Sequence, residues 1–178
     1  MVCPRCILAV EQTLEEMQIP YQSVHLGTAI VNLPAEKIDF DELGNRLYQI
    51  GFELLKDKNE QLIEQIKTLI IDYIHYQGKH SQNISEFLTG HTGKDYSFLS
   101  KSFSKKENIT IEKYVILQKV EKIKELLTYD ELSISEISYQ LEYSSVQHLS
   151  AQFKKITGLT PSQFKKEKKL HRRFLDDV

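Results

Sequence analysis

The chain reads SISEISYQLEYSSVQHLSAQFKKITGLTP over residues 133–161, and fifty positions earlier, over residues 83–111, it reads NISEFLTGHTGKDYSFLSKSFSKKENITI. The two stretches share Ile-Ser-Glu near the start, Leu-Ser and Phe in the middle, and Lys and Thr towards the end. Similarity at one fixed offset indicates a single supersecondary unit that is built twice.

Both copies begin with the signals of a helix start. Ser133 and Glu136 have the spacing of an N-cap residue and the N3 residue that bonds back to it, and Asn83 and Glu86 repeat that spacing. Thr160 followed by proline marks a third helix start. Each copy therefore predicts a short capped helix, a tight turn and a second helix, which is a helix-turn-helix.

Between the copies, apolar residues at helical spacing predict one long helix over residues 110–129. At ~1.5 Å per residue, about eighteen residues span ~27 Å. Major-groove faces on one side of B-DNA recur every ~34 Å. A rod of this length could hold two reading helices about one turn apart, although any two-lobed helical domain could have a similar spacer.

Composition and charge set further bounds. The chain has 178 residues with a net charge of -2, but residues 1–58 carry 5 Lys/Arg against 9 Asp/Glu, whereas residues 145–173 carry 8 against 1. Such a basic segment is typical of a nucleic-acid-binding end and also of a solvated helix face, so charge alone leaves both open. No apolar run is long enough to span a bilayer, and no export signal opens the chain. We expect a cytoplasmic protein with no membrane partner.

The second helix of each copy separates into an apolar and a polar face. In the second copy the residues expected to face the core are Val146, Leu149, Phe153 and Ile156, and in the first they are Leu99 and Phe103. The residues left facing outward in the second copy are Gln147, His148, Ser150, Ala151, Gln152, Lys154 and Lys155. In the first copy they are Ser97, Ser100, Lys101 and Ser104, followed by Lys105 and Lys106.

These side chains suit contacts with a DNA duplex. Glutamine can form a bidentate bond to adenine and serine can bond several base edges, whereas lysine usually meets phosphate. We expect Lys154 and Lys155 to bind phosphate. For His148 a half-buried place in the helix is slightly favoured over base reading.

Residues 83–166 resemble the two-unit DNA-binding domain of AraC-type bacterial transcription regulators. The closing run Phe-Lys-Lys-x-x-Gly-x-x-Pro, residues 153–161, is specific to that family. The resemblance implies reading positions at Ser97, Ser100 and Lys101 in the first copy, and at Gln147, His148, Ser150 and Ala151 in the second. Two residues depart from the family pattern: Glu142 stands where the turn usually holds glycine, and Ala151 where a longer polar side chain often reads a base.

The first 55 residues have a different pattern. Periodicity and turn residues predict a helix, two strands, a second helix and a last strand, over residues 7–17, 21–26, 29–33, 40–50 and 52–55. Cys3 and Cys6 stand at the start of the first helix, where the helix N-terminus favours thiolate. Two thiolates alone suit Cu(I), whereas tetrahedral Zn(II) would need two more ligands.

This pattern, with Met-x-Cys-x-x-Cys in front, resembles the heavy-metal-associated domain of copper chaperones and metal-pumping ATPases. That fold is βαββαβ, so its central first strand is missing here, and we expect seven or eight further residues (~3.3 Å each) to precede Met1 in the native protein. The resemblance implies a metal sensor at Cys3 and Cys6. The alternatives are a packing or dimerisation module with vestigial cysteines, and a thiol–disulfide switch, which a cytoplasmic setting disfavours.

The sequence thus predicts a mainly α chain: a ferredoxin-like α/β module (residues 1–57), a linker and leading helix (residues 58–80), and a double helix-turn-helix domain (residues 81–178). We expect a sequence-specific transcription regulator that binds double-stranded DNA, whose front module senses an effector or mediates homodimerisation, and whose partners include the transcription machinery. The alternative is a copper-handling chaperone whose helical half binds a protein. No phosphate-binding glycine loop, nucleophile–base pair or carboxylate cluster indicates an enzyme.

Overall fold

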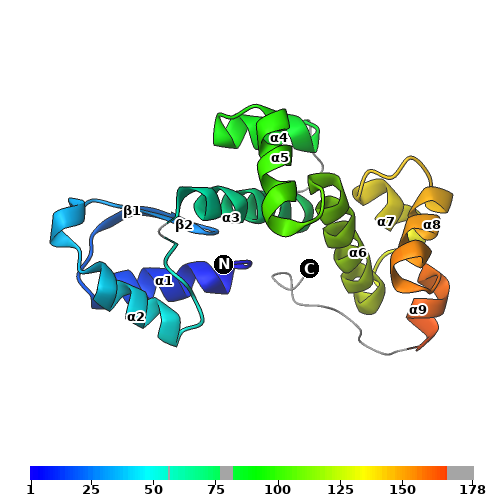
Figure 1. Ribbon diagram of the computed structural model, residues 1–178. Helices are drawn as coiled ribbons and strands as arrows, with labels where there is room; N and C mark the ends of the chain where they lie inside the picture. Colours follow the sequence, from blue (N-terminus) through cyan, green and yellow to red (C-terminus); the bar gives the residue numbers. More distant parts are fainter. Residues whose placement is uncertain (56, 77–81, 168–178) are drawn as a thin grey trace. The chain divides into compact units, whose positions relative to one another are not determined.

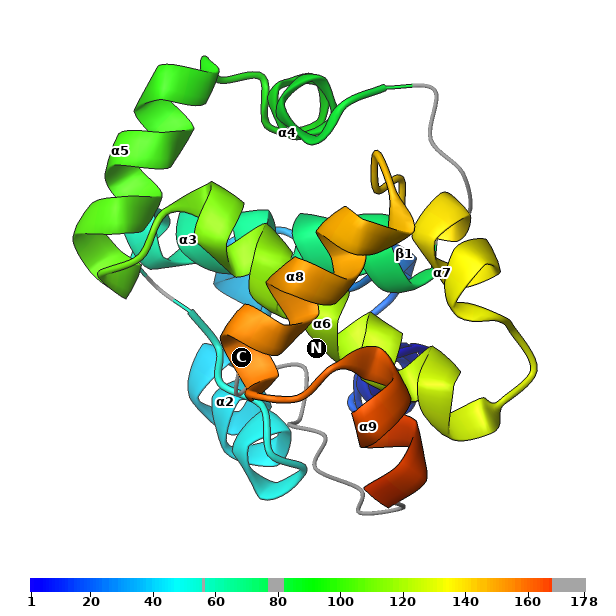
Figure 2. The same ribbon diagram turned by 90° about the vertical axis from the view of Figure 1, so that its right-hand side faces the viewer.

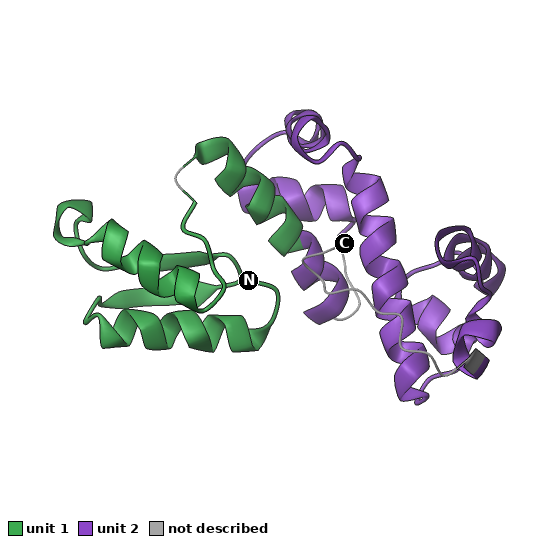
Figure 3. Cartoon of the chain, turned by 60° about the horizontal axis from the view of Figure 1, so that its bottom comes forward, with its two compact units in different colours: residues 1–69 green, residues 70–178 purple. Residues whose placement is uncertain are grey.

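The computed structural model describes residues 1–55, 57–76 and 82–167 (Figure 1). It divides into two compact units, residues 1–69 and 70–178, and the division falls within helix α3 (Lys58–Ile71) (Figure 3). The described part is mainly helical with one small sheet, which confirms the predicted fold class. The three-part division at residues 57 and 80 stays a prediction. No described helix is long and apolar enough to cross a membrane.

The first unit builds a small core between two helices and a hairpin. Its elements are α1 (Pro4–Glu16), β1 (Tyr21–His25), β2 (Thr28–Val31), the 3-10 turn η1 (Ala35–Lys37), α2 (Phe40–Gln49) and the first part of α3. The strands pair antiparallel with Val24 opposite Ala29, and Gly27 takes φ +76° in the turn between them. Residues at helical spacing face inward as predicted, with Val10 and Leu14 on α1 and the buried pair on α2, Leu43 and Leu47.

The strand predicted over residues 52–55 is wrong. The chain leaves α2 through Gly51 at φ +83°, and the Phe52 N–H returns to the Leu47 carbonyl at 2.8 Å. Residues 52–55 then run on without strand pairing. A strand forms only beside a neighbour that pairs with its backbone, and the described sheet contains only β1 and β2.

The second unit contains the two predicted helix-turn-helix copies. Its elements are the π-helical turn η2 (Asp72–Tyr76), α4 (Ile84–Thr92), α5 (Tyr96–Glu107), α6 (Ile111–Tyr129), α7 (Ile134–Gln140), α8 (Val146–Thr157) and α9 (Pro161–Glu167). The end of the segment predicted as a linker and leading helix, near residue 80, lies outside the described residues. Helix α3 already begins at Lys58, so the start of that segment is helical.

All three predicted helix starts are confirmed. Asn83 accepts from the Glu86 N–H at 2.9 Å while the Glu86 carboxylate accepts from the Asn83 N–H at 3.3 Å. Ser133 and Glu136 form the same reciprocal pair at 3.2 and 2.8 Å. At the third start Thr160 accepts from the Gln163 N–H at 3.2 Å. The capping residues satisfy helix N–H groups that would otherwise lack partners.

Helix α6 connects two similar lobes (Figures 1 and 2). In the first lobe the rings of Phe103 (α5) and Tyr114 (α6) have centroids 5.5 Å apart, and in the second Phe153 (α8) and Phe164 (α9) are also 5.5 Å apart. These pairs stand at equivalent positions of the repeat. The duplicated sequence therefore produces duplicated aromatic packing around one predicted long helix, which the structure confirms at Ile111–Tyr129.

Candidate nucleic-acid interface

Helix α5 presents a small polar surface in the first lobe. Leu99 and Phe103 are fully buried, as predicted. Ser97 and Lys101 are exposed and Ser100 is partly exposed on the other side of the helix. The structure thus leaves the three predicted reading positions accessible.

The start of α5 is tied to the start of α6. The Tyr96 hydroxyl donates to a carboxylate oxygen of Glu112 at 2.6 Å. Burial and this hydrogen bond raise the pKa of Tyr96 well above its usual value, and the same bond lowers the pKa of Glu112. The contact fixes the helix that carries Ser97 and Lys101 against the long connecting helix.

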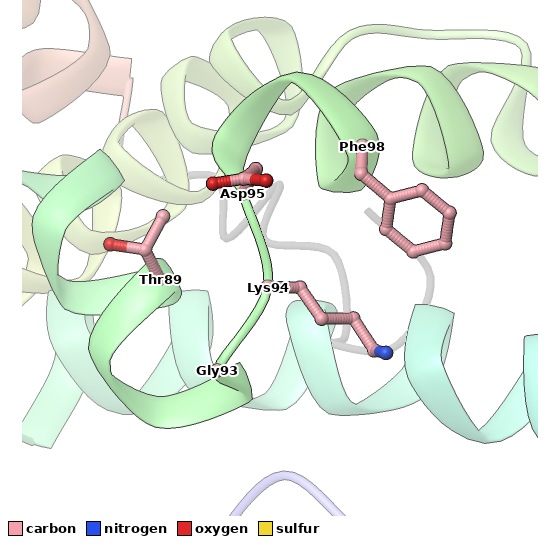
Figure 4. A pocket seen from close by; sticks show the side chains of 5 residues that line it. All are labelled: Thr89, Gly93, Lys94, Asp95 and Phe98. Atoms are coloured by element: carbon pink, nitrogen blue, oxygen red, sulfur yellow. The ribbon is translucent and has the colours of Figure 1, made fainter.

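An open hollow of about 480 Å³ lies at the turn of the first lobe, lined by Thr89, Gly93, Lys94, Asp95 and Phe98 (Figure 4). The Phe98 ring is 51% exposed, and the Lys94 ammonium lies 5.5 Å from its centroid. Neither residue was predicted from the sequence. Phe98 is an apolar residue next to the core position Leu99, and no local pattern indicates that it faces solvent. An exposed aromatic ring next to a lysine can offer both apolar and cationic contacts.

Helix α8 presents a larger polar and basic surface in the second lobe. Leu149 and Phe153 are fully buried, whereas Val146 and Ile156, also expected in the core, are only partly buried. The reading and phosphate-binding candidates that are exposed are Gln147, His148, Ala151, Lys154 and Lys155, and Ser150 is partly exposed. The helix carries no Asp or Glu, so its outward face is cationic.

His148 is exposed, and the half-buried position favoured for it is wrong. Its Nδ1 lies 3.1 Å from the Ser144 Oγ, and its ring meets the edge of the Tyr143 ring at a centroid distance of 5.5 Å. The residue sits near the start of the helix, outside the apolar stripe, where the preceding turn rather than the core supports its ring.

The turn before α8 adopts the strained backbone that the sequence indicated. Glu142 has φ 57°, the left-handed region that favours glycine, at a cost of ~1 kcal/mol or more for a residue with a side chain. Lys119 of α6 supports this turn: its Nζ donates to the Leu141 carbonyl at 2.7 Å. In the first lobe the left-handed residue is Gly93, so the two turns differ although their helices repeat.

Cys3 and Cys6 lie together at the start of α1, with their Sγ atoms 3.5 Å apart. Burial opposes the thiolate of Cys6, but backbone hydrogen bonds at Val2 and Cys3 outweigh it and lower the pKa of this thiol. Among the described residues no three or more His, Cys, Asp and Glu side chains gather to hold a metal ion. The pair therefore offers two sulfur donors, which suits a two-coordinate soft cation better than tetrahedral Zn(II).

Residues 88–167 match the protein family described as a helix-turn-helix domain. In fold the chain is similar to the C-terminal domain of AraT, a response regulator from Geobacillus stearothermophilus, with a TM-score of 0.55 at 20% identity over 66% of this chain and 94% of that chain. It is also similar to a transcriptional regulator with an AraC-type DNA-binding domain from Chromobacterium violaceum, with a TM-score of 0.52 at 16% identity over 61% of this chain and 96% of that one. Residues 88–167 therefore match the helix-turn-helix family in sequence, and the chain shares its fold with these two solved proteins; we call this segment the helix-turn-helix domain.

Curated relatives match this chain in sequence. The Msm operon regulatory protein of Streptococcus mutans serotype c is 28% identical over 142 residues, which are 76% of this chain and 51% of that protein. The xylose operon regulatory protein of Haemophilus influenzae is 30% identical over 93 residues, 52% of this chain and 24% of that protein. The chain therefore spans about half or less of the length of these relatives.

These comparisons bear on the other expectations as well. Both relatives are named as operon regulatory proteins. The family match covers none of residues 1–55, so the heavy-metal-associated resemblance of that segment stays a prediction. Four of the basic residues counted in the segment 145–173 lie outside the described residues: Lys168, Lys169, Arg172 and Arg173.

Proposed function

We propose that residues 88–167 are an AraC-type domain that binds double-stranded DNA by placing α5 and α8 in successive major grooves, and that the protein regulates transcription in a sequence-specific way. The observation that carries this proposal is the accessible polar and basic face on α5 and on α8, with both lobes of the second unit packed against the single helix α6. The proposed DNA-contacting residues are Ser97, Ser100, Lys101, Gln147, His148, Ser150, Ala151, Lys154 and Lys155.

The two reading helices have different tasks in this proposal. On α8, the exposed amide of Gln147 reads adenine, and Lys154 and Lys155 bind phosphates. On α5, short serine side chains limit base reading, so that helix mainly sets the position of the domain. The methyl group of Ala151 offers apolar contact to thymine but no hydrogen bond, which reduces discrimination at its base pair.

The experiment is a salt titration of duplex binding. A pool of random duplexes is selected with the unmodified protein, and the recovered duplex is then measured with Lys154→Gln/Lys155→Gln. Each lost phosphate contact lowers the salt slope by about 0.9, so the double variant should bind more weakly across sequences with a slope smaller by about 2. The matched control, Lys37→Gln/Lys58→Gln, removes the same charge from exposed positions of the first unit. Failure of the unmodified protein to bind any duplex at low salt would contradict the proposal.

We further propose that residues 1–57 sense an effector or mediate homodimerisation, with Cys3 and Cys6 as a site for Cu(I). The support is the pair of adjacent thiols, one of them with a lowered pKa. Repeating the titration with one equivalent of Cu(I) should change DNA affinity in the unmodified protein and leave Cys3→Ser/Cys6→Ser unchanged. Equal behaviour of both proteins would remove metal sensing from the account and leave DNA binding in place.

A further inference from the structure

The turn between α7 and α8 is held by a side chain from the connecting helix. The Lys119 Nζ donates to the Leu141 carbonyl at 2.7 Å and also lies 5.3 Å from the centroid of the Tyr143 ring. Burial lowers the pKa of Lys119. The lysine therefore satisfies the carbonyl of Leu141, the C-cap residue of α7, and contacts the ring that follows Glu142.

Tyr143 in turn contacts two residues of α8. Its hydroxyl donates to the Gln152 Oε1 at 2.5 Å, and its ring meets the edge of the His148 ring at 80°. Burial raises the pKa of Tyr143 to about 12, so the hydroxyl keeps its proton at neutral pH. Gln152 and His148 are one helical turn apart and therefore share one edge of the helix.

The hydrogen bond from Tyr143 determines which atom of Gln152 remains available to a ligand. With Oε1 of Gln152 engaged by Tyr143, its Nε2 has two N–H donors and no acceptor to offer. Gln152 is partly buried, whereas Gln147 and Lys154 are exposed, so Gln152 lies at the margin of the outward face. A donor at the margin of a reading helix suits a phosphate oxygen better than a base edge.

We propose that Tyr143 is a positioning residue of the second reading helix: its hydroxyl holds the Gln152 amide so that Nε2 donates to a backbone phosphate of the duplex. This inference rests on the proposed DNA binding and adds Gln152 as a contact and Tyr143 as the group that orients it. Because the contact is neutral, its loss weakens binding to all sequences without changing the salt slope, in contrast to the loss of Lys154 and Lys155.

The test is a double-mutant cycle on the selected duplex, with Tyr143→Phe, Gln152→Ala and the combined variant. Tyr143→Phe keeps the ring beside Lys119 and His148 and removes only the hydroxyl. Loss of one hydrogen bond predicts about three- to tenfold weaker binding. In the Gln152→Ala background the same change should alter affinity less than about twofold, because coupled residues are not additive. Tyr129→Phe, at an exposed position, is the control and should leave affinity unchanged.

A second readout follows the free protein. The side-chain amide resonance of Gln152, assigned by its absence in Gln152→Ala, should shift in Tyr143→Phe and not in Tyr129→Phe. Equal losses from Tyr143→Phe in both backgrounds, or an unmoved amide resonance, would overturn the positioning role while DNA binding stands. If the unmodified protein binds no duplex, the proposed function fails and this inference with it.

Discussion

At the scale of single residues, the two lobes depend on a few aromatic side chains at equivalent positions. Phe103 and Phe153 are fully buried, each against one further ring. A ring pair of this kind contributes about 0.5–1.5 kcal/mol beyond the area it buries. The two pairs have the same centroid distance of 5.5 Å at equivalent positions of the repeat, although one is tilted at 60° and the other is edge-to-face at 83°. One sequence pattern can therefore pack both lobes against α6.

Tyr143 gives a residue-scale prediction for alkaline pH. Burial raises its pKa from 10.0 to about 12 in the folded protein. A phenol that holds its proton more tightly when folded contributes stability below pH 10.0, and this contribution is lost as the pH rises through about 12. Urea unfolding at a series of pH values should therefore show a steeper fall of the free energy of unfolding across this window for the unmodified protein than for Tyr143→Phe.

The comparison is internally controlled because Tyr73 and Tyr96, whose pKa values are also raised, titrate in both proteins. A difference in the free energy of unfolding that stays constant across this pH range would contradict a raised pKa of Tyr143 in the folded protein.

At the scale of elements, capping residues define where the helices begin. The Ser133 side chain accepts from the Glu136 N–H at 3.2 Å, and loss of an N-cap of this type costs about 1 kcal/mol. We expect Ser133→Ala to lower the free energy of unfolding by about that amount, measured by urea denaturation. The exposed Ser135, two residues later in the first turn, provides the control: Ser135→Ala should change stability by less than about 0.5 kcal/mol, and an equal loss in the two variants would count against the cap.

Helix starts were predictable because each capping box depends on only four consecutive residues, as at Asn83 and Ser133. The strand expected at residues 52–55 failed because strands depend on partners elsewhere in the chain. The exposure of His148 and Phe98 depends on how α8 and α5 are rotated against the core, and this rotation is set by packing with other helices. The link from Lys119 to Leu141 joins residues 22 positions apart, and no local pattern predicts such a contact.

At the scale of the whole molecule, the account depends on α6 as a spacer between two reading helices. Its 19 residues correspond to about 28 Å at ~1.5 Å per residue, close to the ~34 Å repeat of one DNA turn. The curated relatives are longer than this chain, and residues 88–167 are the part that matches the helix-turn-helix family. The proposed role of the first unit is to change DNA affinity, so it requires that residues 88–167 bind DNA.

The most direct test changes the spacing in the DNA rather than in the protein. About five base pairs, half a helical turn, are inserted between the two half-sites of the duplex recovered by selection. The affinity for this duplex is compared with that for a control duplex lengthened by the same amount at its end. Two helices on one rigid rod predict that the internal insertion lowers affinity to near the non-specific level, while the end extension has no effect. Equal affinity for both duplexes would contradict simultaneous binding of α5 and α8.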